Sequence, residues 1–124
     1  MTIIEAINQL DSLKHNTYSQ DDKIRWLSRV DWMVKRHIID THADTNNVTF
    51  TGYDEMTDIN TELLIPAPYD EVYLRWLEAQ IDYANGEYGK YNNAITMFNT
   101  AFEDFAKYYT RNNMPISHGQ RFVF

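Results

Sequence analysis

An unbroken helical spacing in the second half of the chain limits its fold more than any other feature. Apolar and aromatic side chains recur three and four residues apart from Leu74 to Tyr109, over five heptads. Such spacing places side chains along one face of an α-helix. This face, here called the seam, includes Leu77, Ile81, Tyr88, Tyr91, Ile95, Phe98, Phe102, Phe105 and Tyr109. It predicts a long C-terminal helix whose seam forms the core.

The stretch YANGEYGKYNN, residues 83–93, changes the composition without changing the spacing. Gly86 and Gly89 fall on the face away from the seam, where each glycine costs about 1 kcal/mol relative to alanine but causes no clash. We therefore expect one helix over about 70–112, with a kink near Gly86. Asn-Gly is also a strong stop signal, so a helical hairpin at Gly86 is the alternative.

Two shorter amphipathic helices are predicted in the first part of the chain. One covers about residues 2–14, behind a Thr2 cap. The other covers about 20–42, because Ser19 is a good N-cap with Asp22 three residues on. Its apolar stripe consists of Ile24, Leu27, Val30, Val34 and Ile38. The fold class predicted from these patterns is an all-α helical bundle.

The negative charge of the chain is concentrated in its middle. The net charge is −7, and eight of the 18 acidic residues lie between His37 and Leu74, where there is no Lys or Arg. The rest of the chain is close to neutral. This distribution argues against a phosphate-binding surface, since Lys and Arg supply most of the affinity for nucleic acid.

Residues 43–69 form a long acidic loop in this prediction, because helical spacing is lost and Thr, Asn, Asp and Pro are frequent. The alternation over 48–51 and the apolar run 63–65 suggest a small β-hairpin within it. A loop of this length is usually functional or disordered. We expect a partner-facing arm that presents Asp54, Glu55, Asp58 and Glu62, with a solvated loop without a partner as the alternative.

The last residues cannot continue the helix, because Pro115 and Gly119 interrupt it. The predicted organisation is therefore a single helical domain, 1–113, followed by a C-terminal extension, 114–124. The extension ends in a short β-prone piece made of Arg121, Phe122, Val123 and Phe124. Such a piece either docks back on the core or adds a strand to the sheet of another protein.

Several function classes find no support in the sequence. There is no cysteine, the four histidines are scattered, and no zinc-protease, phosphate-loop, nucleophile-elbow or dinucleotide motif is present. We therefore expect no enzyme, cofactor or metal site. No apolar run approaches the ~20 residues that span a bilayer, and we expect a soluble protein made in the cytoplasm.

Aromatic residues are frequent for a chain of this size, with nine Tyr, six Phe and three Trp. Tyr, Phe and Trp are enriched at subunit interfaces. A seam this long also needs more covering surface than a 20-residue helix offers. Self-association is the expectation that follows.

Two blocks of the sequence carry a resemblance to a known group of proteins. They are YSQDDKIRWLSRVD at 18–31 and ELLIPAPYDEVYLRWLEAQIDYANGEYGKYNNAITMFNTAFEDFAKYYTRNNMP at 62–115. Both are similar to head–tail connector, or adaptor, proteins encoded by tailed bacteriophages and prophages of Gram-positive bacteria. Neither block is a catalytic signature, so the resemblance concerns a role in assembly.

The resemblance implies a mostly helical subunit that forms a ring, usually of 12 copies, beneath the portal protein of the virion neck. Such a ring extends the DNA channel, lets DNA pass without specific binding, and meets a downstream neck or tail protein. Assembly would take place in the cytoplasm of the host bacterium. Adaptors of this type commonly grip the portal with a C-terminal extension, here Arg121, Phe122, Val123 and Phe124. A different class of function, a small acidic prophage regulator or inhibitor that mimics DNA, is the alternative.

Overall fold

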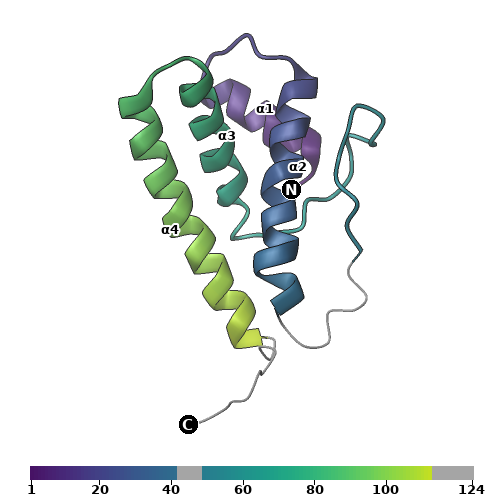
Figure 1. Cartoon of the computed structure of the whole chain (residues 1–124). Helices are drawn as coiled ribbons and strands as arrows, with labels where there is room; N and C mark the ends of the chain where they lie inside the picture. The colour runs from purple at the N-terminus through teal and green to yellow at the C-terminus, as the bar shows by residue number, and fades with distance from the viewer. Residues whose placement is uncertain (42–48, 113–124) are drawn as a thin grey trace.

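Four α-helices and one short 3-10 turn make up the regular structure of residues 1–41 and 49–112, which the computed structural model describes (Figure 1). In chain order they are α1 (Ile3–Leu13), α2 (Gln20–His37), the 3-10 turn η1 (Ile39–Thr41), α3 (Glu71–Ala84) and α4 (Tyr88–Asn112). No strand occurs in these ranges. The prediction of an all-α protein with a long C-terminal helix is confirmed.

The starts of α1 and α2 follow the predicted caps. Thr2 accepts a hydrogen bond from the Glu5 amide at 3.2 Å, and Glu5 accepts one from the Thr2 amide at 2.9 Å. Ser19 accepts from the Asp22 amide at 3.1 Å. These bonds satisfy backbone donors that have no partner within the helix. The second helix ends slightly earlier than expected, at His37, and continues as η1 to Thr41.

The single helix expected over about 70–112 is wrong, and the alternative, a hairpin, is what the structure contains. Gly86 has a φ of +75°, a left-handed conformation that glycine adopts without strain. The amides of Asn85, Gly86 and Glu87 donate to Ile81, Tyr83 and Asp82, respectively, and so close the end of α3. Figure 1 shows α3 and α4 running antiparallel, side by side. The connection is about as long as one helical turn, which explains why the spacing of apolar residues continues through it.

α3 is the central helix of the bundle. It contacts α1, α2 and α4, whereas α4 approaches only α3 among the described helices. Side chains of α1, α2 and α3 that are almost fully buried form most of the core. The largest of them include Ile3, Leu10, Leu27, Tyr73, Leu77 and Ile81.

The loop packs against the bundle and contains no β-hairpin in its described part, residues 49–69. Its only β-type pairing there is an isolated bridge between Thr2 and Glu62. The amides of Ile3 and Ile4, in the first turn of α1, donate to backbone carbonyls of the loop. Leu63 and Ile65 from the predicted β run are buried in the core instead. Burial in the core thus outweighs the β preference of this run.

Candidate partner-binding surface

The four predicted carboxylates of the loop, Asp54, Glu55, Asp58 and Glu62, are all exposed. Asp54 accepts a hydrogen bond from the Met56 amide and Asp58 accepts one from the Asn60 amide, both at 2.9 Å, so two tight turns shape this stretch. Met56, between them, is 85% exposed. We call residues 54–62 the acidic segment. It presents carboxylates and one apolar side chain to the solvent.

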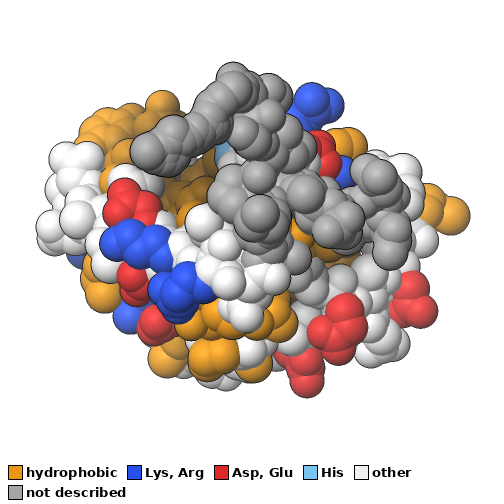
Figure 2. All heavy atoms as spheres, turned by 90° about the horizontal axis from the view of Figure 1, so that it is seen from below, with side chains coloured by type: hydrophobic (Ala, Val, Ile, Leu, Met, Phe, Trp, Pro, Cys, Tyr) orange, Lys and Arg blue, Asp and Glu red, His pale blue; other side chains and the backbone are white. Residues whose placement is uncertain are grey.

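Charge is distributed differently on the two sides of the molecule. On the side of the loop, at the lower right of Figure 2, acidic side chains lie without Lys or Arg beside them; on the opposite side basic and acidic side chains alternate. Only Glu62 of the acidic segment has an ion pair in the described structure, with the terminal ammonium of Met1 at 3.2 Å. The acidic segment is therefore suited to a positively charged partner, or to repelling an anionic one.

Aromatic contacts fasten the loop to α2 just before the acidic segment. Phe50 packs edge-on against Trp32 at 4.8 Å and against Tyr53 at 5.0 Å between ring centroids. Ser28 accepts a hydrogen bond from the Tyr53 amide at 2.9 Å. Gly52 has a φ of +89°, and a Cβ there would lie 3.0 Å from the Trp32 ring nitrogen. Only glycine fits comfortably at this position.

A buried carboxylate, Asp31 on α2, lies beneath the loop. Its side chain accepts hydrogen bonds from the Tyr53 hydroxyl at 2.5 Å, the Tyr73 hydroxyl at 2.6 Å and the Leu64 amide at 3.1 Å. Burial raises the pKa of Asp31 to about 6, although these three bonds oppose the rise. Burial, followed by the nearby Asp31 charge, raises the pKa of both tyrosines.

Sequence reasoning missed Asp31 and its two tyrosine partners, although one signal was available. Asp31 lies four residues after Leu27 and three before Val34, on the apolar stripe of α2. A carboxylate on a buried stripe requires hydrogen-bond donors from elsewhere in the chain. The loop and α3 supply them.

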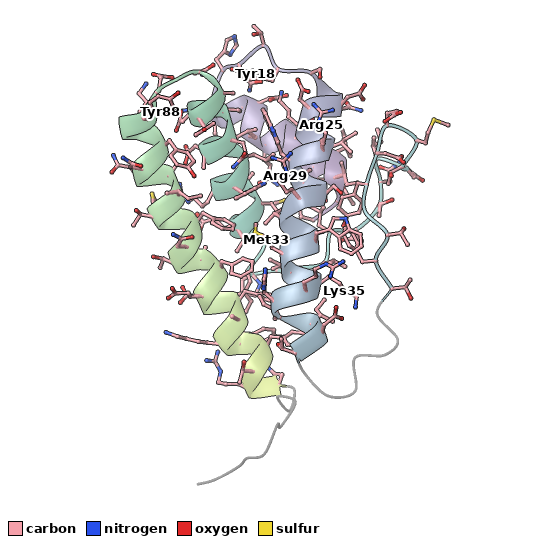
Figure 3. All side chains as sticks on the ribbon, viewed as in Figure 1. Tyr18, Arg25, Arg29, Met33, Lys35 and Tyr88 are labelled. Atoms are coloured by element: carbon pink, nitrogen blue, oxygen red, sulfur yellow. The ribbon has the colours of Figure 1, made fainter. Side chains whose placement is uncertain are left out.

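The predicted seam divides into buried and exposed parts. Leu77, Ile81, Phe98 and Phe105 are buried, and Tyr91, Ile95, Phe102 and Tyr109 are partly exposed. Tyr88 is 59% exposed and does not belong to the core, because it begins α4 beside the turn (Figure 3). We call Tyr88, Tyr91, Ile95 and Phe102 the open face of α4.

The end of the bundle near the α3–α4 turn is held by polar contacts with the α1–α2 connection. The Lys14 ammonium lies 2.7 Å from Oδ1 of buried Asp82, an oxygen that accepts no aligned hydrogen bond, so charge attraction holds this pair. The Tyr18 hydroxyl donates to Asn85 at 2.6 Å.

Two surface hollows of about 190 and 260 Å³ lie along α3 and α4 and share Met97.

The structure also bears on the predicted tail and on possible metal sites and membrane spans. The tail residues Arg121, Phe122, Val123 and Phe124 lie outside the described residues. Within residues 1–41 and 49–112, no three Asp, Glu or His side chains are close enough together to hold a metal ion. None of the described helices combines the length and apolar character needed to cross a membrane.

Comparison of the chain with protein-family models, with curated proteins and with solved structures found no match.

Proposed function

We propose that this chain is a structural protein of the bacteriophage virion, a head–tail connector that forms a ring beneath the portal protein. The ring extends the DNA channel toward the tail and meets a downstream neck or tail protein. The subunits are made in the bacterial cytoplasm and end up in the virion neck. The resemblance of residues 18–31 and 62–115 to connector proteins motivates this proposal.

The observation that carries the proposal is the incomplete burial of α4. This helix has 25 residues, and α3 is the one described α-helix whose backbone lies close beside it. Its open face therefore keeps aromatic and aliphatic surface accessible, and Tyr and Phe are favoured at subunit contacts. A neighbouring subunit in a ring, proposed here at 12 copies, would cover such a face.

The acidic segment has two roles open to it in this proposal. Facing the lumen, its carboxylates would repel the DNA phosphates, so that DNA slides through without being held. Facing downstream, they would contact the next neck protein. Both roles agree with the exposure of Asp54, Glu55 and Asp58 and with the lack of Lys and Arg between 38 and 74.

Light scattering of the chain mixed with portal protein tests the proposal. We expect a ring-sized complex when portal protein is present. A monomer in the absence of portal protein would also agree with the proposal, in which contact with the portal triggers assembly of the ring. Deleting 116–124, which carries the proposed portal-docking residues, should leave the melting temperature unchanged and abolish the complex. If the full chain forms no complex with portal at any ratio, the proposal is wrong.

A DNA-mimic inhibitor is the second candidate, favoured by the exposed carboxylates of the acidic segment. Neutralising Glu55 and Asp58 to Gln and Asn distinguishes the two functions, with Glu103→Gln and Asp104→Asn on α4 as the charge-matched control. An inhibitor would lose its capture of a DNA-binding protein only in the loop variant. A connector would form the portal complex in both variants.

A further inference from the structure

Asp31 holds both ends of the acidic segment. Its Oδ2 accepts hydrogen bonds from the Tyr53 hydroxyl and from the Leu64 amide, which immediately precede and closely follow residues 54–62. Its Oδ1 accepts from Tyr73 of α3, and that hydroxyl in turn accepts from the Ile65 amide at 2.7 Å. One side chain thus joins α2, α3 and both ends of the segment.

A carboxylate is an unusual choice for this position. Asp31 is fully buried, and the ion pairs of the described residues do not include it. Lys35, one turn further along α2, pairs with Asp40 instead. A buried charge without a counter-charge is costly, and a neutral side chain would fill the same space at lower cost. The three donors that converge on Asp31 offset part of this cost.

We propose that Asp31 is a positioning residue that clamps the base of the acidic segment, and that ionisation of this buried carboxyl group, which has no counter-charge, makes the clamp easier to open. This inference rests on the proposed function only in taking the acidic segment as the partner-facing part of the chain. Tyr53 from the loop and Tyr73 from α3 are the titratable groups that face Asp31, and both remain neutral over the accessible pH range.

Proton linkage decides at which pH the clamp is most stable. In the clamped state the pKa of Asp31 is raised to about 6, and it returns toward its ordinary value of 3.8 when the loop opens and water reaches the carboxyl group. The clamped state therefore binds the proton more tightly than the open state. Clamping is strongest below pH 4 and weakens as the pH rises through about 6.

Hydrogen exchange of the loop amides, corrected for intrinsic rates, tests the proposal on the full chain. Between pH 4 and pH 8 the protection of the Tyr53, Leu64 and Ile65 amides should fall by up to about 100-fold, the ratio that corresponds to the two pKa values. In Asp31→Asn, which is neutral at every pH and similar in shape, this pH dependence should disappear.

A second variant keeps the test decisive even if Asp31→Asn destabilises the whole chain. Tyr53→Phe removes one donor at one end of the segment, so protection should fall at the Tyr53 side of the loop more than in α1. Tyr18→Phe removes a comparable tyrosine hydrogen bond far from the loop and should leave loop protection unchanged. Circular dichroism melting separates local opening from global unfolding.

The proposal fails if Asp31→Asn retains the pH dependence of the wild-type loop, or if wild-type protection rises with pH. It also fails if Tyr53→Phe and Tyr18→Phe behave alike. These measurements use the chain alone, without portal protein. A chain that shows the clamp but forms no complex with portal would overturn the proposed function only, and the reverse result would overturn the clamp only.

Discussion

Helices α3 and α4 share one continuous spacing of apolar residues but differ in how much of it they bury. Seven of the 14 residues of α3 are buried, against three of the 25 residues of α4. α3 lies between α1, α2 and α4, whereas α4 has α3 alone as a neighbour among the described helices. The spacing of a helix thus defines which face is apolar, and the number of neighbouring helices decides how much of that face is covered.

The two helices are also held by different electrostatics. Asp82 of α3 is buried against Lys14, while the pair between Glu87 and Lys90 at the start of α4 lies on the surface. In the exposed pair the Lys90 contact lowers the pKa of Glu87, and the Glu87 contact raises the pKa of Lys90. Surface pairs contribute little to stability because water screens them. The difference in burial between α3 and α4 therefore extends from apolar to charged side chains.

Truncating equivalent seam residues on the two helices should give the largest contrast. Leu77→Ala on α3 should lower the free energy of unfolding by about 3 kcal/mol, because Leu77 is fully buried and the cavity cannot collapse easily. Ile95→Ala on α4 should cost about 1 kcal/mol, since Ile95 is only partly buried. Urea denaturation measures both values. Equal losses would mean that the open face of α4 is covered in solution, and repeating the measurement at lower protein concentration would reveal cover by a second copy.

Removing the lysine of each ion pair should give the next largest contrast. Lys14→Met should destabilise the chain by roughly 2 kcal/mol, because Asp82 is left buried without a counter-charge. This estimate is below that for a fully buried pair, since Lys14 is 23% exposed. Lys90→Met should leave thermal unfolding unchanged. A loss in Lys90→Met as large as that in Lys14→Met would contradict the comparison.

The contrast between α3 and α4 also explains what the sequence could predict. The all-α class and the caps of α1 and α2 depend on local patterns, and these were predictable. The turn at Gly86 was not, because its length of about one helical turn leaves the 3-4 spacing unchanged. The hydrogen bonds of Asp31 join residues more than 20 positions apart, and no local pattern identifies such partners.

The two glycines near the turn offer a matched pair with opposite expected signs. Gly86→Ala should destabilise the chain by about 1 kcal/mol, because alanine disfavours the φ of +75° that ends α3. Gly89→Ala should stabilise it by up to about 1 kcal/mol, because Gly89 is helical and an added Cβ meets nothing within 4 Å. Thermal unfolding followed by circular dichroism measures both. Stabilisation by both substitutions would contradict the turn at Gly86 and support the prediction of a single long helix.

The smallest effect on stability is expected for the open face itself. Tyr88 is 59% exposed and its ring packs edge-to-face with that of Tyr83, with 5.6 Å between the centroids, so Tyr88→Ser should change the melting temperature little. The same substitution should weaken assembly with portal, because a neighbouring subunit of the proposed ring would gain contact area at an exposed tyrosine on the open face.

Met97→Ser is the control, since Met97 is 46% exposed and nine residues away, half a helical rotation from Tyr88. Light scattering of both variants with portal protein compares the two faces of α4 directly. Loss of assembly in Met97→Ser with normal assembly in Tyr88→Ser would move the proposed subunit contact to the hollows between α3 and α4, and would leave the open face without a role in the ring.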